Sequence, residues 1–108
     1  MPFDEAVAER VRRLLKGRRG IMERKMFGGL AFMLGKRMFC GVLKDNVVLR
    51  INPADHEKAL RKPHIRPMDF TGRPMRGFLY LGPARRLSDP IIARWLKQSL
   101  IYAKTLPR

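Results

Sequence analysis

The spacing of apolar residues along the chain predicts a helix, a series of strands and two further helices. Near the amino end, apolar positions recur every third or fourth residue, which predicts an amphipathic helix over residues 4–16. Gly17 and Gly20 come directly after this pattern. Glycine just beyond the last periodic residue is typical of a helix end, so we expect the chain to turn there.

Short apolar runs separated by turn residues then predict an antiparallel meander. Gly28 and Gly29 suit a tight turn or a bulge after the first strand, and Gly35 suits the next turn. Asp45 and Asn46 tolerate left-handed backbone and are placed at the centre of a third turn. The expected strands cover residues 21–26, 30–34, 38–43, 47–51 and 77–81.

Two helices are expected after the meander. Asn52 before a proline predicts a short helix over residues 53–61, and the three prolines of residues 62–74 predict a loop. Ser88 or Asp89 is expected to cap a C-terminal helix. Its buried arc is predicted to hold Ile91, Ile92, Trp95, Leu96, Ser99, Tyr102 and Ala103, with Leu100 beside it.

Hairpin-joined strands with helices at the ends indicate an α+β fold rather than a parallel α/β fold. We expect an antiparallel meander sheet of about five strands, with an N-terminal helix, a short middle helix and a C-terminal helix. A chain of 108 residues corresponds to one domain, placed at residues 4–104.

Charge changes this picture more than overall composition does. Lys and Arg number 24 against 9 Asp and Glu, giving a formal net charge of +15, and the pI is about 11.4. Such a pI is expected of a polyanion binder, although runs of charge also serve as solvated surfaces. The candidate anion or nucleic-acid contacts are Arg12, Arg13, Lys16, Arg18, Arg19, Arg73, Arg76, Arg94, Lys97 and Lys104.

Aromatic residues give little support to base stacking. Trp95 and Tyr102 fall on the predicted buried arc, and Phe70 and Phe78 are expected to face the core. Nucleic-acid binding would therefore rest on the phosphate backbone, with strong salt dependence and weak selectivity.

The chain offers no recognisable catalytic set, and no metal or cofactor site is expected. Cys40, the single cysteine, lies within a predicted strand and is expected to be buried, and one cysteine permits no internal disulfide. The longest charge-free apolar stretch, residues 26–35, is half the length of a membrane span. We expect a cytoplasmic protein that is not an enzyme.

The most distinctive segment is residues 66–77, Arg-Pro-Met-Asp-Phe-Thr-Gly-Arg-Pro-Met-Arg-Gly. Its arginines at positions 66, 73 and 76 could form a fork-shaped site for phosphate or carboxylate. Alternatively, Asp69 neutralises one of them as a structural ion pair, while Phe70 packs the segment against the core. Gly28 and Gly29 could likewise form an anion-binding backbone nest, although a strand rather than a helix follows them.

Together with Met26-Phe27-Gly28-Gly29, this segment resembles the N-terminal domain of the TfoX/Sxy family, bacterial regulators linked to DNA uptake. The resemblance covers residues 4–104 and is to short, single-domain members. It implies a regulatory role in competence gene expression and brings no catalytic motif. The residues taken as its structural motif are Met26, Phe27, Gly28, Gly29, Asp69, Phe70, Gly72 and Pro74.

Three functions follow as hypotheses. The first is a non-enzymatic regulatory or adaptor domain acting through protein contacts, with a protein partner or a homodimer face at Ile101. The second is a small basic protein that contacts the phosphate backbone of nucleic acid. The third is a small-anion-binding domain that uses the glycine turn and the arginine loop. None of the three involves a membrane.

Overall fold

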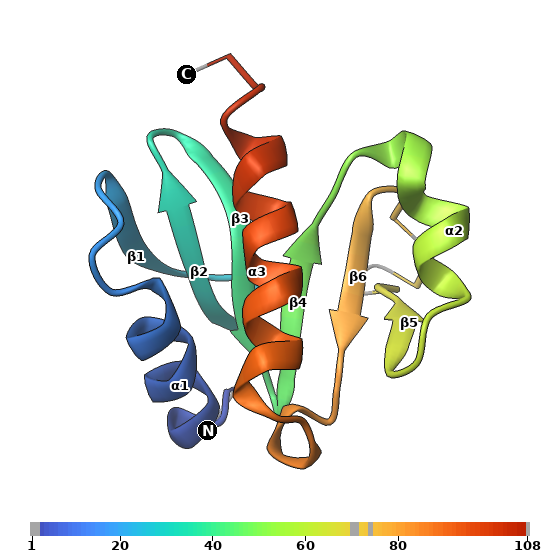
Figure 1. Ribbon diagram of the computed structural model, residues 1–108, viewed down its shortest axis with the longest axis horizontal. Helices are drawn as coiled ribbons and strands as arrows, with labels where there is room; N and C mark the ends of the chain where they lie inside the picture. Colours follow the sequence, from blue (N-terminus) through green and yellow to red (C-terminus); the bar gives the residue numbers. More distant parts are fainter. Residues whose placement is uncertain (1–2, 70–71, 74, 108) are drawn as a thin grey trace.

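A six-stranded antiparallel sheet forms the centre of the fold in the described part of the chain (Figure 1). The computed structural model describes residues 3–69, 72–73 and 75–107. The strands are β1 (Ile21–Met26), β2 (Gly29–Leu34), β3 (Arg37–Leu43), β4 (Asn46–Arg50), β5 (Ile65–Pro67) and β6 (Phe78–Leu81). The helices are α1 (Glu5–Leu15), α2 (His56–Leu60) and α3 (Asp89–Ala103), with short 3-10 turns at Pro53–Asp55 and Ala84–Arg86. This arrangement confirms the α+β prediction.

The strand order is β1-β2-β3-β4-β6-β5, so β5 and β6 are exchanged relative to a simple meander. The sheet has one strand more than predicted, because β5 lies inside the segment that was expected to be a loop. With three residues it is too short to show periodicity. Its proline is tolerated because β5 is the last strand of the sheet and pairs only with β6 among the described strands.

The helices α1 and α3 pack on the same face of the sheet (Figure 1). Alternate strand residues turn their side chains to this face and are buried, as Leu79 and Leu81 are on β6. The largest side chains of this core that are almost fully buried are Phe32, Phe39, Leu49, Ile51, Leu79, Leu81, Ile92 and Leu96. The core thus forms between the helices and one side of the sheet.

Two turns show how backbone conformation sets the register. The turn between β1 and β2 is centred on Phe27 and Gly28, with φ angles of 47° and 77°, and Met26 pairs with Gly29 across it. A tight turn is thus present as predicted, but it is centred one residue earlier than the glycine pair. Gly29 opens β2 instead, where a Cβ atom would collide with the carbonyl oxygen of Val42.

The third turn differs from the prediction by one residue. Its centre is Lys44 and Asp45 rather than Asp45 and Asn46, and Lys44 adopts a φ of 53°. The amide of Asp4 donates to the Lys44 carbonyl at 2.7 Å, and Phe3 forms a β-bridge with Lys44. The segment before α1 therefore holds Lys44 in a conformation that its own side chain does not favour.

The buried face of α3 is rotated slightly from the predicted arc. Ile91 was placed on the arc but is 36% exposed, whereas Leu100 was placed beside it and is only 3% exposed. The helix packs against β3, β4 and α1, and Leu100 belongs to the same buried cluster as Val11 and Leu15 of α1. Trp95 is partly buried and packs against the core.

A buried histidine fixes the middle helix to the chain that precedes β6. His56, the first residue of α2, is 4% exposed, and its Nδ1 accepts a hydrogen bond from the Gly77 amide at 2.9 Å. Gly77 is itself buried, with a φ of 87°. An unpaired buried donor is costly, so this bond fixes where the loop rejoins the sheet.

We expect His56→Ala to lower the free energy of unfolding by about 1–3 kcal/mol, because the Gly77 amide loses its buried acceptor. Urea denaturation monitored by circular dichroism measures the change. Lys58→Ala, at an exposed position of the same helix, is the control and should stay within about 0.5 kcal/mol of the parent chain. Equal effects of the two substitutions would contradict the structural role of the imidazole.

Candidate anion-binding groove

The end of α1 and the exposed side of α3 enclose two adjoining hollows that are rich in cations. One has a volume of about 370 Å³ and the other about 310 Å³, and both are lined by Leu14, Arg18 and Leu100. We call the pair the basic groove. Its cationic residues are Lys16, Arg18, Arg19, Arg94, Lys97 and Lys104.

Local structure explains why these six side chains line the same groove. Gly17, with a φ of 89°, follows the last turn of α1 and turns the chain so that Arg18 and Arg19 lie beside α3. On α3, Arg94, Lys97 and Lys104 are separated by three and seven residues, which places them on one side of the helix. Candidate contacts that lie far apart in the sequence therefore adjoin at this point.

The electrostatics of the basic groove are one-sided. Among the described residues, no Asp or Glu lines either hollow, and none of the six cations forms an ion pair. Like charges around a concave surface with apolar walls reinforce one another and raise the local concentration of anions. The groove can therefore attract an extended anion without first breaking internal salt bridges.

Two of the candidate contacts on α1 are used inside the protein instead. Arg12 donates to Glu23 at 2.6 Å and also contacts Glu9, and these partners raise the pKa of Arg12. Arg13 pairs with Asp89 at 2.7 Å. Both residues lie outside the basic groove, so the candidate contacts on and just after α1 divide into two that are ion-paired, Arg12 and Arg13, and three that have no carboxylate partner among the described residues, Lys16, Arg18 and Arg19.

A guanidinium that sequence reasoning did not single out holds the two helices together. Arg10 donates to Asp89 at 2.8 Å and to the carbonyls of Ala84 at 2.8 Å and Leu87 at 2.6 Å. Hydrogen bonds from Arg10 and then Arg13 lower the pKa of Asp89. Asp89 was considered only as a helix cap. Ser88, rather than Asp89, holds the N-cap position of α3. The Asp89 carboxylate lines neither hollow of the basic groove.

The loop arginines have separate partners. Arg66 donates to Asn46 at 2.6 Å and lies 5.5 Å from the centre of the Tyr80 ring, whereas Arg76 is 3.6 Å from Glu57 on α2. The hypothetical fork of three arginines is therefore not supported, and Arg73 is exposed. The alternative ion pair of Asp69 is absent from the ion pairs of the described residues. Phe70 and Pro74 lie outside the described residues.

Phe78 does not face the core, contrary to the prediction. It alternates with the buried Leu79 on β6 and lies half-buried on the sheet face away from α3, with the Arg50 guanidinium 5.5 Å from its ring centre. Tyr80 shares this face, and burial, followed by the charge of Asp69, raises its pKa. Both rings already have an arginine neighbour, and neither lies in the basic groove.

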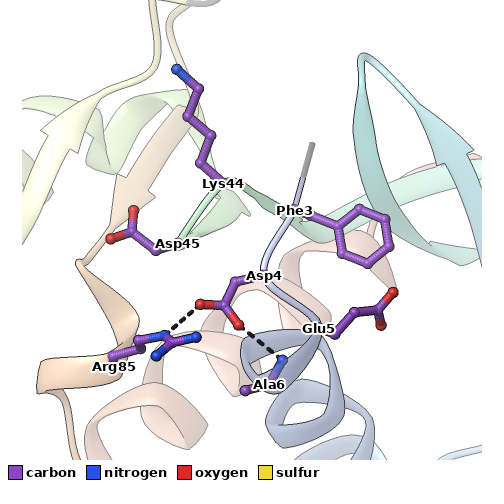
Figure 2. A pocket seen from close by; sticks show the side chains of 7 residues that line it. All are labelled: Phe3, Asp4, Glu5, Ala6, Lys44, Asp45 and Arg85. Atoms are coloured by element: carbon purple, nitrogen blue, oxygen red, sulfur yellow. Dashed lines mark hydrogen bonds and ion pairs between the residues drawn. The ribbon is translucent and has the colours of Figure 1, made fainter. Parts of the chain in front are cut away.

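A further hollow of about 540 Å³ lies at the start of α1 (Figure 2). Asp4 caps the helix by accepting from the Ala6 amide at 2.9 Å, and its other carboxylate oxygen pairs with Arg85. The hydrogen bond from Arg85 is the main cause that lowers the pKa of Asp4. Because the acid and the arginine neutralise each other, we interpret this hollow as structural.

Metal binding, thiol reactivity and membrane insertion were also considered for the described residues. These residues contain no group of three or more His, Cys, Asp or Glu side chains arranged to hold a metal ion. Cys40 is fully buried on β3, as predicted, and burial raises the pKa of its thiol well above the ordinary value. Among the described helices, none has the length and apolar character needed to cross a membrane.

Comparison with known proteins finds one family. The family model described as the TfoX N-terminal domain matches residues 13–103 of the 108-residue chain. The match includes five of the six cationic groove residues, all but Lys104. No curated protein and no solved structure matches the chain.

The lowered pKa values of Asp4 and Asp89 predict a loss of stability in acid. Both carboxyls have a folded-state pKa below the ordinary 3.8, so the unfolded chain binds protons more readily. Their contribution is therefore complete above about pH 5 and is lost as the pH falls through the folded pKa values. Urea midpoints measured from pH 7 to pH 2 should show this fall.

Asp89→Asn should lower the urea midpoint at pH 7 and reduce the further loss in acid. Asp55→Asn is the control, since Asp55 is exposed and forms no ion pair with any described residue. If both variants gave the same pH profile, Asp89 would have no special part in joining α1 to α3.

Proposed function

This chain belongs to the TfoX N-terminal domain family, and on that premise we propose that its basic groove binds the phosphate backbone of nucleic acid. The single observation that carries this proposal is the concentration around one concave surface of six cations that have no carboxylate partner in the described part of the chain. In this view the chain is a non-enzymatic regulatory domain, because binding, rather than bond breaking, is what such a groove can do.

The side chains of the basic groove suit the phosphate backbone of nucleic acid better than its bases. Lysine and arginine neutralise phosphates and release the condensed counterions, which provides affinity without reading sequence. Leu14 and Leu100 supply the apolar wall and offer no hydrogen bonds to base edges. We therefore expect affinity that depends steeply on salt and only weakly on sequence.

The triple variant Arg18→Gln, Arg94→Gln, Lys97→Gln tests this proposal on duplex DNA. Each lost phosphate contact should reduce the slope of log K against log salt by about 0.9, so the triple change should reduce it by about 2.7. Binding at 50 mM salt should weaken by at least about tenfold. Fluorescence anisotropy over a range of salt concentrations measures both quantities.

The matched control is Lys58→Gln, Arg61→Gln, Lys62→Gln, which removes the same charge from exposed positions on and after α2. Equal losses in the two triple variants would show that net charge, rather than the basic groove, determines binding. Absence of binding by the parent chain at low salt would eliminate the proposal.

Adaptor function through a protein contact is the second candidate, and one side chain favours it. Ile101 is 55% exposed and lies four residues after Lys97 and three before Lys104, within the basic side of α3. An apolar residue surrounded by cations suits a partner surface that has an apolar centre and an acidic rim. This candidate also agrees with the regulatory role that the family resemblance implies.

Ile101→Glu separates this candidate from the first. Capture of an acidic protein from nuclease-treated lysate should fall by at least about tenfold, which corresponds to about 1.4 kcal/mol of binding free energy. Ile91→Glu, at an exposed apolar position that lines neither hollow of the basic groove, is the control. Unchanged protein capture by Ile101→Glu would exclude Ile101 as the contact.

A further inference from the structure

The two edges of the sheet are different. β5, at one edge, has three residues and includes Pro67, which cannot donate a backbone hydrogen bond. β1, at the other edge, has six residues without proline and pairs only with β2 among the described strands. Strand edges with unpaired backbone groups are templates for pairing with another chain, so β1 is the edge that can accept a strand.

The side chains of β1 are unusually exposed. Met22 is 69% exposed and Met26 is 39% exposed, and with Arg24 they lie on the sheet face away from the helices. Glu23 and Lys25 lie on the helix face, where Glu23 meets Arg12 of α1. The edge therefore presents an apolar pair on one face and a pair of opposite charges on the other.

The turn at Phe27 and Gly28 determines which backbone groups of β1 point outward. Because Met26 and Gly29 close a two-residue turn, they are a hydrogen-bonded pair, and alternate residues of β1 repeat that arrangement. Glu23 and Lys25 fall between them, so their N–H and C=O groups are directed away from β2. An added strand must form its hydrogen bonds with these residues.

We propose that β1 pairs antiparallel with β1 of a second copy, about a twofold axis perpendicular to the sheet at Arg24. In this register, Glu23 of each copy lies opposite Lys25 of the other and exchanges backbone hydrogen bonds with it. On the sheet face away from the helices, Met22 of each copy lies across from Met26 of the other. Apolar pairs and pairs of opposite charge directly across strands stabilise a sheet.

The alternative register, with the twofold axis at Glu23, brings together side chains that are less complementary. An axis at Glu23 instead of Arg24 would place the two Glu23 carboxylates opposite one another and Met22 opposite Arg24. Like charges directly opposite destabilise an antiparallel pair. The register centred on Arg24 also has one like-charged pair, but it gains two apolar pairs and two pairs of opposite charge.

Electrostatics give this association a characteristic salt dependence. Each copy carries a net charge of +15, and the two Arg24 side chains meet at the axis, so long-range repulsion opposes pairing. Screening shortens the Debye length from about 8 Å at physiological ionic strength to about 3 Å at 1 M. The dimer should therefore strengthen as salt rises, whereas nucleic-acid binding weakens, so the two proposals can fail independently.

Cross-linking tests the register directly. Arg24 residues of the two copies form a non-hydrogen-bonded pair, whose Cα atoms are about 4.5 Å apart and within reach of a disulfide. Arg24→Cys should therefore give a disulfide-linked dimer under copper-phenanthroline oxidation at 0.5 M NaCl. The native Cys40 is fully buried and should leave the parent chain monomeric on a non-reducing gel.

Met22→Cys is the matched control. Met22 is highly exposed, but in the proposed pairing it lies four residues along the strands from Met22 of the second copy. Arg24→Cys should cross-link at least about tenfold faster than Met22→Cys, since only the former meets the distance requirement of a disulfide. Equal rates would indicate random collision, and faster cross-linking of Glu23→Cys would indicate the other register. Either result, or no cross-linking of any variant, would overturn the proposal.

Discussion

The contact between Arg10 and the start of α3 determines how the helical layer is arranged. One guanidinium donates to the carboxylate of Asp89 and to two backbone carbonyls just before the helix. It therefore holds α1 beside α3 at the amino end of α3, and further along the two helices Leu14 and Leu100 line the hollows between them. The basic groove is the space that remains between these helices, so its cations can act together only while this contact persists.

The high positive charge of the chain becomes informative only after the ion pairs are known. Arg10, Arg12, Arg13 and Arg85 are engaged by Asp89, Glu9, Glu23 and Asp4, and they stabilise the fold. The cations of the basic groove have no such partners among the described residues. The two sets of basic residues thus have different physical roles, although a count of charges treats them alike.

Sequence reasoning predicted the features that depend on local pattern. The bounds of α1, the turn at the glycine pair and the burial of Cys40 all follow from periodicity or from the conformation of single residues. Partners distant in sequence were missed. Arg10 and Asp89 are 79 positions apart, and His56 and Gly77 are 21 apart. The pairing of β5 with β6 was also missed, because β5 is too short to carry a periodic signal.

The blunt edge at β5 sets a limit on assembly. A sheet that could grow from both sides would allow copies to add without end and form a filament. Here Pro67 and the shortness of β5 prevent growth from one side, so any pairing through β1 consumes the only extendable edge of each described sheet. A dimer formed as proposed would therefore keep no free β1 edge through which a third copy could add to the sheet.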